Sequence, residues 1–169
     1  NFIVNHPESP MSSEAYLQMA NLYFQQGNYA EALEWYNAID ELGVSTEEKA
    51  RFNFQKGYCL FHTGKQAESK PYFESVQNNP LYADNAKYYL GYIAYDSDDY
   101  AKAESYFREV QDDATLSKNV SYFQANMYFK QALYDEAIEE GQKQLAKTKS
   151  AQEISELNKI IGESYFNQK

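Results

Sequence analysis

The sequence predicts an all-α fold assembled from repeated pairs of helices. Over residues 84–110, apolar and small side chains recur at helical spacing on both sides of a short polar break. The chain contains only 7 Gly and 4 Pro among 169 residues, which leaves room for long helices. The same pattern returns along the chain at intervals of 34 or 37 residues. A stack of helix pairs, a solenoid, is therefore expected.

Residues 84–110 give the clearest copy of the repeating unit. With Asp84 counted as position 1, the marker residues at positions 8, 12, 20 and 24 are Gly91, Tyr95, Ala103 and Phe107. Small residues at positions 8 and 20 let two helices approach closely, and aromatic rings fill the space beside them. The polar residues 96–99 between the two helical patterns predict a tight turn.

These positions recur along the whole chain. Position 8 holds Gly or Ala at residues 20, 57, 91, 125 and 162, which are separated by 37, 34, 34 and 37 residues. Position 12 is aromatic in each copy: Phe24, Phe61, Tyr95, Phe129 and Phe166. Position 20 is Ala or Ser in the four complete copies: Ala32, Ser69, Ala103 and Ala137. The sequence therefore predicts four helix pairs followed by one trailing helix.

This pattern resembles the tetratricopeptide repeat, a unit of about 34 residues made of a helix pair. In the third copy, the matching residues are Leu90, Gly91, Tyr100, Ala103 and Phe107. The resemblance implies a right-handed α-solenoid with four full repeats in residues 13–149. Residues 150–169 would form a capping or partial-repeat helix, and residues 1–12 the tail of an upstream repeat or a linker. Because each repeat packs only on its neighbours, the array is expected to be one cooperative unit.

Caps and turns predict the helix limits of the first two copies. Pro10, capped by Ser9, opens the first helix, Gly27 marks its turn, and Gly43 is a plausible stop for the second helix. In the second copy, Ser45 and Glu48 form a capping box, and Gly64 marks the turn.

Two residues of the second copy depart from the pattern. Lys56 stands where an apolar residue is usual. Pro71 falls inside the second helix, which is expected to tolerate it near its start, to begin late or to kink.

The later copies carry their own signals. Asn79 and Pro80 are expected to supply the cap and first position of the third copy's first helix. In the fourth copy Ala132 lies at the turn, and Gly141 replaces the aromatic residue of position 24, which predicts thinner packing there. Ser150 and Glu153 form a further capping box. One apolar face of the trailing helix is expected to comprise Ile154, Leu157, Ile161 and Tyr165.

Composition excludes several classes of function. The formal net charge of −10 disfavours binding to nucleic acid through phosphate neutralisation. The longest apolar run, residues 88–95, is far shorter than the ~20 residues of a membrane span, so no membrane insertion by this segment is expected. Cys59 is the only cysteine and is expected to be a buried structural thiol.

No set of residues predicts catalysis, a metal site or a cofactor. His6 and His62 each lack a second ligand at metal-binding spacing, and both are expected to lie at the surface. Residues 96–99 are acidic but lack the Gly and Glu that follow in a calcium-binding loop, so a solvated turn is expected instead. The sequence predicts that the protein is not an enzyme.

The resemblance also implies a binding surface, because first helices of this family line a concave groove. The corresponding residues are Asn21, Phe24, Phe54, Tyr58, Phe61, Tyr88, Tyr92, Tyr95, Tyr122, Asn126 and Phe129. Rigid aromatic side chains of this kind anchor partners well. The Lys and Arg residues with which some family members clamp a C-terminal carboxylate are missing from these positions. The aromatic residues of position 12 have an alternative role, since they also pack between neighbouring helices.

The leading hypothesis is a non-catalytic module that binds a protein, as a peptide or a partner helix, in this groove. The alternatives are a scaffold or spacer in a bacterial envelope assembly and a glycan-binding solenoid. The residues HPESP before the first helix are similar to repeats of bacterial outer-membrane assembly lipoproteins and periplasmic coordinators. Periplasm or cell envelope and cytoplasm both stay open as locations, as do the partner's identity and the oligomeric state.

Overall fold

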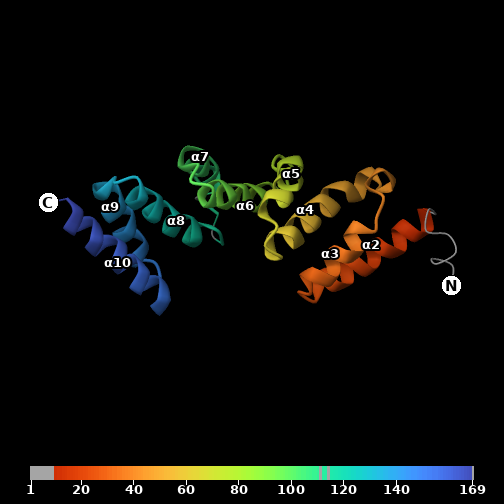
Figure 1. Cartoon of the computed structure of the whole chain (residues 1–169), viewed down its shortest axis with the longest axis horizontal. Coiled ribbons are helices and arrows are strands. Elements are labelled where there is room, and N and C mark those ends of the chain that lie inside the picture. The colour runs from red at the N-terminus through yellow and green to blue at the C-terminus, as the bar shows by residue number, and fades with distance from the viewer. Residues whose placement is uncertain (1–9, 111, 114, 169) are drawn as a thin grey trace. The chain divides into compact units, whose positions relative to one another are not determined.

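A computed structural model describes residues 10–110, 112, 113 and 115–168, and every regular element in them is helical (Figure 1). The predicted all-α repeat fold is confirmed. In chain order the helices are α2 (Pro10–Gln25), α3 (Tyr29–Asn37), the 3-10 helix η1 (Glu41–Gly43), α4 (Thr46–His62), α5 (Gln66–Val76), α6 (Ala83–Asp96), α7 (Tyr100–Val110), α8 (Ser117–Lys130), α9 (Tyr134–Leu145) and α10 (Ala151–Asn167). The expectations placed on residues 1–9, among them His6 and Ser9, lie outside the described residues.

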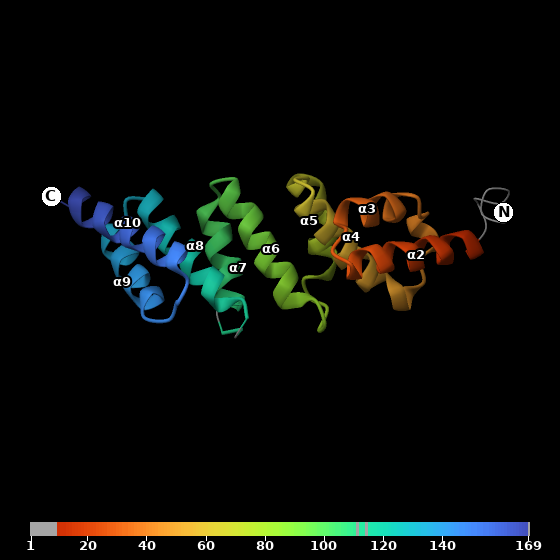
Figure 2. The same ribbon diagram turned by 90° about the horizontal axis from the view of Figure 1, so that it is seen from below.

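The helices group into two compact units, divided after Ala86 in the first turn of α6. In the N-terminal unit α2 packs on α3, α3 on α4, and α4 on α5. In the C-terminal unit α7 packs on α8, α8 on α9, and α9 on α10 (Figure 2). Sequential helices therefore lie next to each other within each unit, as expected for a solenoid.

All four turns inside the helix pairs have the same geometry at the same repeat position. Position 15 adopts a left-handed backbone, with φ values of 77°, 81°, 58° and 59° at Gly27, Gly64, Asp98 and Ala132. In the first turn, the Asn28 amide donates to the Tyr23 carbonyl at 3.0 Å, and the Gly27 amide donates to Phe24 at 3.0 Å. This pair of bonds, which the other three turns repeat, is the Schellman motif that ends many helices.

The predicted helix starts are confirmed at two capping serines. Ser45 Oγ accepts from the Glu48 amide at 3.3 Å, and Ser150 Oγ accepts from the Glu153 amide at 3.4 Å. The Glu48 side chain bonds to Arg51 instead of returning to its cap. Each Ser therefore satisfies one of the amides that a helix leaves without an internal partner.

Two predicted limits are wrong. Helix α3 ends at Asn37, well before Gly43, which closes η1 instead. Helix α6 begins at Ala83 rather than at Pro80. Asn79 Oδ1 accepts from the Leu81 amide at 3.0 Å, so Asn79 stabilises a separate turn ahead of the helix. Helix α5 begins at Gln66 and continues through Pro71, so the helix tolerates this proline, one of the expected outcomes, and does not begin late.

The core of the N-terminal unit includes one buried charge. Around the buried Ala20, Ala32, Tyr36 and Phe52, Lys56 is only 7% exposed. Its ammonium group lies 2.8 Å from Glu41 Oε1, and the Tyr72 hydroxyl donates to the same oxygen at 2.7 Å. The unusual lysine of the second repeat is therefore compensated by a carboxylate, as a buried charge must be.

The core of the C-terminal unit shows why position 8 must be small. A Cβ added to Gly91 would lie 2.6 Å from Cε1 of the buried Phe107. The thinner packing predicted at Gly141 is not found, because a Cβ there would lie 2.9 Å from Ile161 Cγ1. Ile161 of α10 thus fills the space that an aromatic side chain of α9 would take.

The predicted apolar face of α10 is wrong in part. The buried residues are Leu157, Ile160 and Ser164, whereas Ile154 and Tyr165 are exposed. Helix α10 packs against both α8 and α9, and this contact buries Ser164. The Ser164 hydroxyl donates to the Ile160 carbonyl at 2.7 Å. A buried hydroxyl that bonds to its own helix needs no partner elsewhere.

Candidate functional site

The predicted groove residues are borne by first helices α2, α4, α6 and α8, and all of them are partly exposed. None is fully buried, and none projects freely into solvent. Each unit carries its own share of the set, so the two shares are described separately. What each side chain touches decides whether it is available to a partner.

In the N-terminal unit, Tyr58 is at the centre of an aromatic cluster. Its ring centroid lies 5.4 Å from that of Phe24, 5.1 Å from that of Tyr29 and 4.2 Å from that of His62. A hydrogen bond with Tyr58 raises the pKa of the Tyr29 hydroxyl. His62 is exposed as expected, yet burial of its ring against this cluster lowers the pKa of its imidazole. The cluster is closely packed, so it offers a rigid surface.

Two more predicted residues lie beside this cluster on α4. Phe54 is stacked on Tyr82 with 4.8 Å between ring centroids, and Phe61 lies 6.5 Å from the buried Phe73. Tyr29 and Tyr82 were not predicted, because neither lies on a first helix and the family positions do not point to them. Only the fold brings these two rings to the predicted residues.

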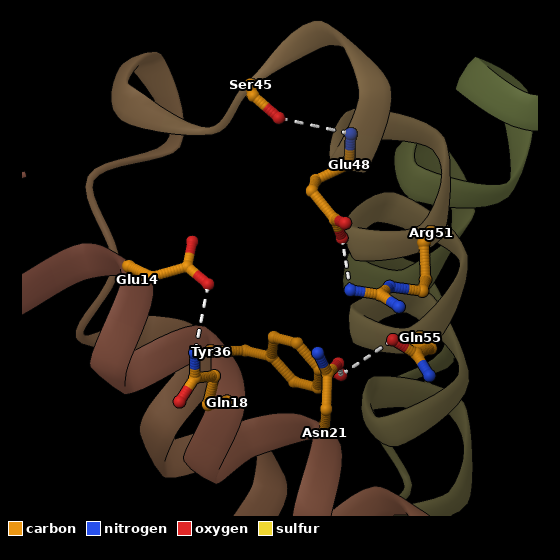
Figure 3. A network of polar contacts seen from close by, with 8 residues as sticks. All are labelled: Glu14, Gln18, Asn21, Tyr36, Ser45, Glu48, Arg51 and Gln55. Carbon is orange, nitrogen blue, oxygen red and sulfur yellow. Dashed lines mark hydrogen bonds and ion pairs between the residues drawn. The ribbon is translucent and has the colours of Figure 1, made fainter. Parts of the chain in front are cut away.

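A strip of polar side chains joins α2 to α4 (Figure 3). The hydroxyl of the fully buried Tyr36 lies 3.0 Å from both Asn21 Oδ1 and Gln55 Oε1. Asn21, a predicted groove residue, is therefore already within hydrogen-bond distance of a side chain of its own unit. Burial raises the pKa of the Tyr36 hydroxyl far above its usual value, so this hydroxyl stays protonated and can donate.

In the C-terminal unit, Phe123 is the centre of the aromatic cluster. Its ring lies 5.3 Å from that of Tyr92, 5.1 Å from that of Tyr95 and 5.7 Å from that of the buried Phe107. The Lys130 ammonium group lies 4.8 Å above the Tyr95 ring, at cation–π distance. Tyr92 and Tyr95 therefore gather around Phe123, a residue at position 6.

Two tyrosines of the predicted set are partly buried beside polar side chains. Burial raises the pKa of the Tyr88 hydroxyl. Burial and the neighbouring Glu156 carboxylate raise the pKa of the Tyr122 hydroxyl. Phe129 stands apart from the others, since its ring lies beside that of Tyr134 on α9 at 6.0 Å. Phe129, a position-12 residue, thus packs against the second helix of its own pair.

A pocket of about 240 Å³ lies between α8 and the first turns of α10. Its walls are formed by Asn119, Tyr122, Phe123, Ser150, Gln152, Glu153 and Glu156. A smaller pocket of about 80 Å³ lies between α2 and the start of α4, where its walls include Glu14, Leu17, Ser45 and Glu48. The larger pocket is below the ~300 Å³ at which most small-molecule sites begin, so its size suits one side chain.

The described side chains form no group of three or more His, Cys, Asp or Glu that could hold a metal ion. Cys59 is fully buried, as predicted, and burial raises the pKa of its thiol to about 12. No helix among the described residues is long and apolar enough to span a membrane.

Comparison with known families identifies the repeats. Models of the tetratricopeptide repeat match residues 13–39 and residues 88–151. The chain is a tetratricopeptide repeat protein. Members of this family are typically non-catalytic and generally mediate protein–protein interaction. A comparison of the sequence with curated proteins gave no match.

Solved structures share the fold of this tetratricopeptide repeat protein at low sequence identity. A structure of MamA MSR-1 is 16% identical, with a TM-score of 0.72 over 92% of this chain and 86% of that one. A MamA D159K mutant is 15% identical, with a TM-score of 0.72 over 94% and 88%. PilF of Pseudomonas aeruginosa is 16% identical, with a TM-score of 0.67 over 86% and 65%. At these identities the likeness concerns the fold alone.

Proposed function

We propose that this protein is a non-catalytic interaction module that binds a partner polypeptide, as an extended peptide or a helix, on the groove face of its first helices. The observation that carries the proposal is that each unit has partly exposed aromatic side chains on its first helices, α4 in the N-terminal unit and α6 and α8 in the C-terminal unit. Such rings offer a large contact area at a low entropic cost, because they have few rotatable bonds and are already held by neighbours.

The contacts of these rings divide them into supports and contact points. Phe129 supports its own helix pair, and Phe54 is covered on one face by Tyr82. Tyr58 and Tyr92 are partly exposed, and their rings are held by those of Phe24 and Phe123. We therefore assign these two tyrosines as the contact points of the two units.

The test uses a displayed library of random dodecapeptides selected on the intact protein. Peptides selected on the wild type should bind the Tyr58→Ala, Tyr92→Ala double variant about tenfold more weakly or worse, a loss of about 1.4 kcal/mol or more. Tyr106→Ala, which changes a partly exposed tyrosine of the second helix α7, is the matched control and should bind normally. Circular dichroism melting would establish that each variant is folded.

Equal binding by the double variant and the wild type would refute the groove proposal. Selection of no peptide at all, together with tyrosine fluorescence changes on addition of oligosaccharides, would favour the glycan-binding alternative instead. If the double variant proves unfolded, the single variants Tyr58→Phe and Tyr92→Phe keep the rings and test the hydroxyl contacts alone.

A second candidate function is a scaffold in a bacterial envelope assembly. It is favoured by large exposed apolar side chains that are not among the eleven predicted groove residues, namely Leu42 at 94%, Leu81 at 79% and Phe166 at 76%. Exposed apolar residues of this size often mark contact sites. A scaffold would lose assembly when Leu42, Leu81 or Phe166 is changed to Ser, whereas the groove variants would assemble normally.

A further inference from the structure

The two pockets occupy equivalent places in the repeat. We call the contact of α2 with α4 the N-terminal junction and the contact of α8 with α10 the C-terminal junction. Each residue of the N-terminal junction corresponds to the residue 105 positions later in the C-terminal junction, as Ala20 corresponds to Ala125 and Gly57 to Gly162. Each pocket lies where the capped start of a first helix meets the preceding first helix.

The two pockets differ in charge. In the N-terminal junction, the Arg51 guanidinium forms an ion pair with the Glu48 carboxylate (Figure 3). The equivalents in the C-terminal junction are Glu156 and Glu153, so a second carboxylate stands where the cation was. Within the part of the chain that the structure describes, no ion pair reaches either carboxylate. Thr148 donates to Glu153 and Gln152 donates to Glu156 at 3.2 Å, which are bonds from neutral groups.

The two pockets also differ in size. The C-terminal pocket has a volume of about 240 Å³, against about 80 Å³ in the N-terminal junction. Glu153 offsets the positive end of the α10 dipole, but Glu156 lies beyond the first turn and adds a negative charge to the wall. The surroundings therefore favour a cation over an anion.

The remaining walls suit a flat cation. The Tyr122 and Phe123 rings line the pocket with 5.6 Å between their centroids, in an edge arrangement. Tyr122 and Glu156 both line the pocket, and burial together with this carboxylate raises the pKa of the Tyr122 hydroxyl, so the carboxylate lies close to the tyrosine side chain. A guanidinium group combines ion pairing to carboxylates with stacking on aromatic faces, whereas an ammonium group does not match this flat geometry.

Resting on the proposed function, we propose that the C-terminal pocket receives an arginine side chain of the partner polypeptide, with its guanidinium between the Glu153 and Glu156 carboxylates and against the Tyr122 ring. The arginine takes the place that Arg51 occupies in the N-terminal junction. The partner is thereby defined as a basic segment, which complements the net charge of −10 of this chain.

The test repeats the dodecapeptide selection on the wild type, on Glu156→Gln and on Glu156→Arg. Peptides selected on the wild type should share an arginine, and replacing that arginine with the neutral isostere citrulline should weaken binding about tenfold. The same replacement should change binding to Glu156→Gln less than about twofold. In Glu156→Arg the new guanidinium should pair with Glu153, as Arg51 does with Glu48, and abolish the arginine preference while the fold is kept.

The outcomes separate this inference from the proposed function. Selected peptides that lose binding to the Tyr58→Ala, Tyr92→Ala variant but bind equally well with citrulline would overturn the arginine pocket and leave the groove intact. Enrichment of acidic peptides without any arginine would also overturn it. If the wild type selects no peptide, the groove proposal and the pocket proposal both fail.

Discussion

The N-terminal and C-terminal junctions have the same repeat spacing and the same capping serine, but they are stabilised by opposite means. At position 24, Tyr36 fills the first junction and bonds to side chains of α2 and α4. At the same position of the second junction, Gly141 leaves the space to Ile161. At position 7, Lys56 is paired with Glu41 in the first junction, and the equivalent residue of the second is Ile161 itself.

The same repeat position therefore has different structural roles in the two junctions. The first junction is polar, because the buried Tyr36 and Lys56 side chains both have polar partners there. The second junction is apolar in its core and open at its rim, where the pocket carries two carboxylates. The predictions below, in order of expected effect, test how far this contrast holds.

Tyr36→Ala should have the largest effect, about 3–5 kcal/mol of lost stability, because it empties a fully buried space and removes the hydroxyl that holds Asn21 and Gln55. Ile161→Ala in the second junction should cost less, about 1–2 kcal/mol, because Ile161 is only partly buried. Urea unfolding checks both variants. The fluorescence of Trp35, the only tryptophan, follows the N-terminal unit, and circular dichroism follows the whole chain. Equal losses would mean that the two junctions are equivalent after all.

Glu41→Gln should lower stability at neutral pH by about 1–2 kcal/mol, since it removes the carboxylate that compensates Lys56. Burial acts to raise the pKa of the Glu41 carboxyl, but the hydrogen bonds from Lys56 and Tyr72 outweigh it and hold the pKa below its usual value. The stabilisation is therefore complete above the ordinary carboxyl pKa of about 4.3 and is lost as pH falls through the lower folded value.

At high pH, the stabilisation by the Lys56–Glu41 pair is limited by the pKa of Lys56, which is raised. Burial acts to lower this pKa, but the bonds to Glu41 and Tyr72 outweigh it, so the contribution of Lys56 is lost as pH rises beyond its usual value of about 10.4. Because the Glu41 carboxylate becomes protonated in acid, the difference in melting temperature between wild type and Glu41→Gln should shrink below about pH 4. A difference that stays constant between pH 7 and the acid range would show that the Glu41 charge does not contribute.

Gly57→Ala and Gly162→Ala should change stability in opposite directions, although both residues occupy position 8. A Cβ at Gly57 would lie 3.0 Å from Tyr72 Cβ, which is fixed to the backbone of α5, so a loss of about 1 kcal/mol is expected. At Gly162 no described atom lies within 4 Å of the added Cβ, so alanine should gain about 0.5–1 kcal/mol through its higher helix propensity. Thermal denaturation of the two single variants decides this, and a loss at Gly162 would contradict it.

Ala132→Gly should give the smallest effect, a gain of about 0.5–1 kcal/mol. Ala132 adopts a φ of 59°, which an alanine side chain opposes, whereas the corresponding turns of the N-terminal unit have Gly27 and Gly64. The matched change Gly64→Ala should lose a similar amount. Chemical denaturation measures both variants, and an unchanged midpoint for Ala132→Gly would mean that the turn relaxes around its alanine.

The fold could be predicted because it depends on short-range patterns. Helix caps such as Ser45 and Ser150, the turn at Gly64 and the small residues of position 8 act within one helix pair, so their spacing reads directly from the chain. Helix limits were less predictable. Asn79 has the chemistry of a helix cap, but the backbone uses it for a turn ahead of α6.

The candidate site could be predicted only in part. The family positions select the first-helix residues, among them Tyr58, Tyr92 and Tyr122, which are partly exposed. They do not select Tyr29 or Tyr82, because these rings reach the cluster from a second helix and from a loop. They also do not reveal that Phe129 turns toward Tyr134.

The sequence by itself determined the helix pairs, their order, the places of their turns and the helices that bear the groove residues, because each of these depends on residues close together in the chain. Only the tertiary structure decided which side chains fill the junctions. Ile161 replaces the missing ring at Gly141, and Glu41 compensates Lys56 across a contact between separate elements. Such contacts depend on how helices approach each other, and a one-dimensional pattern does not contain that geometry. The same holds for the pocket between α8 and α10, whose two carboxylates meet the Tyr122 ring only after the helices have packed.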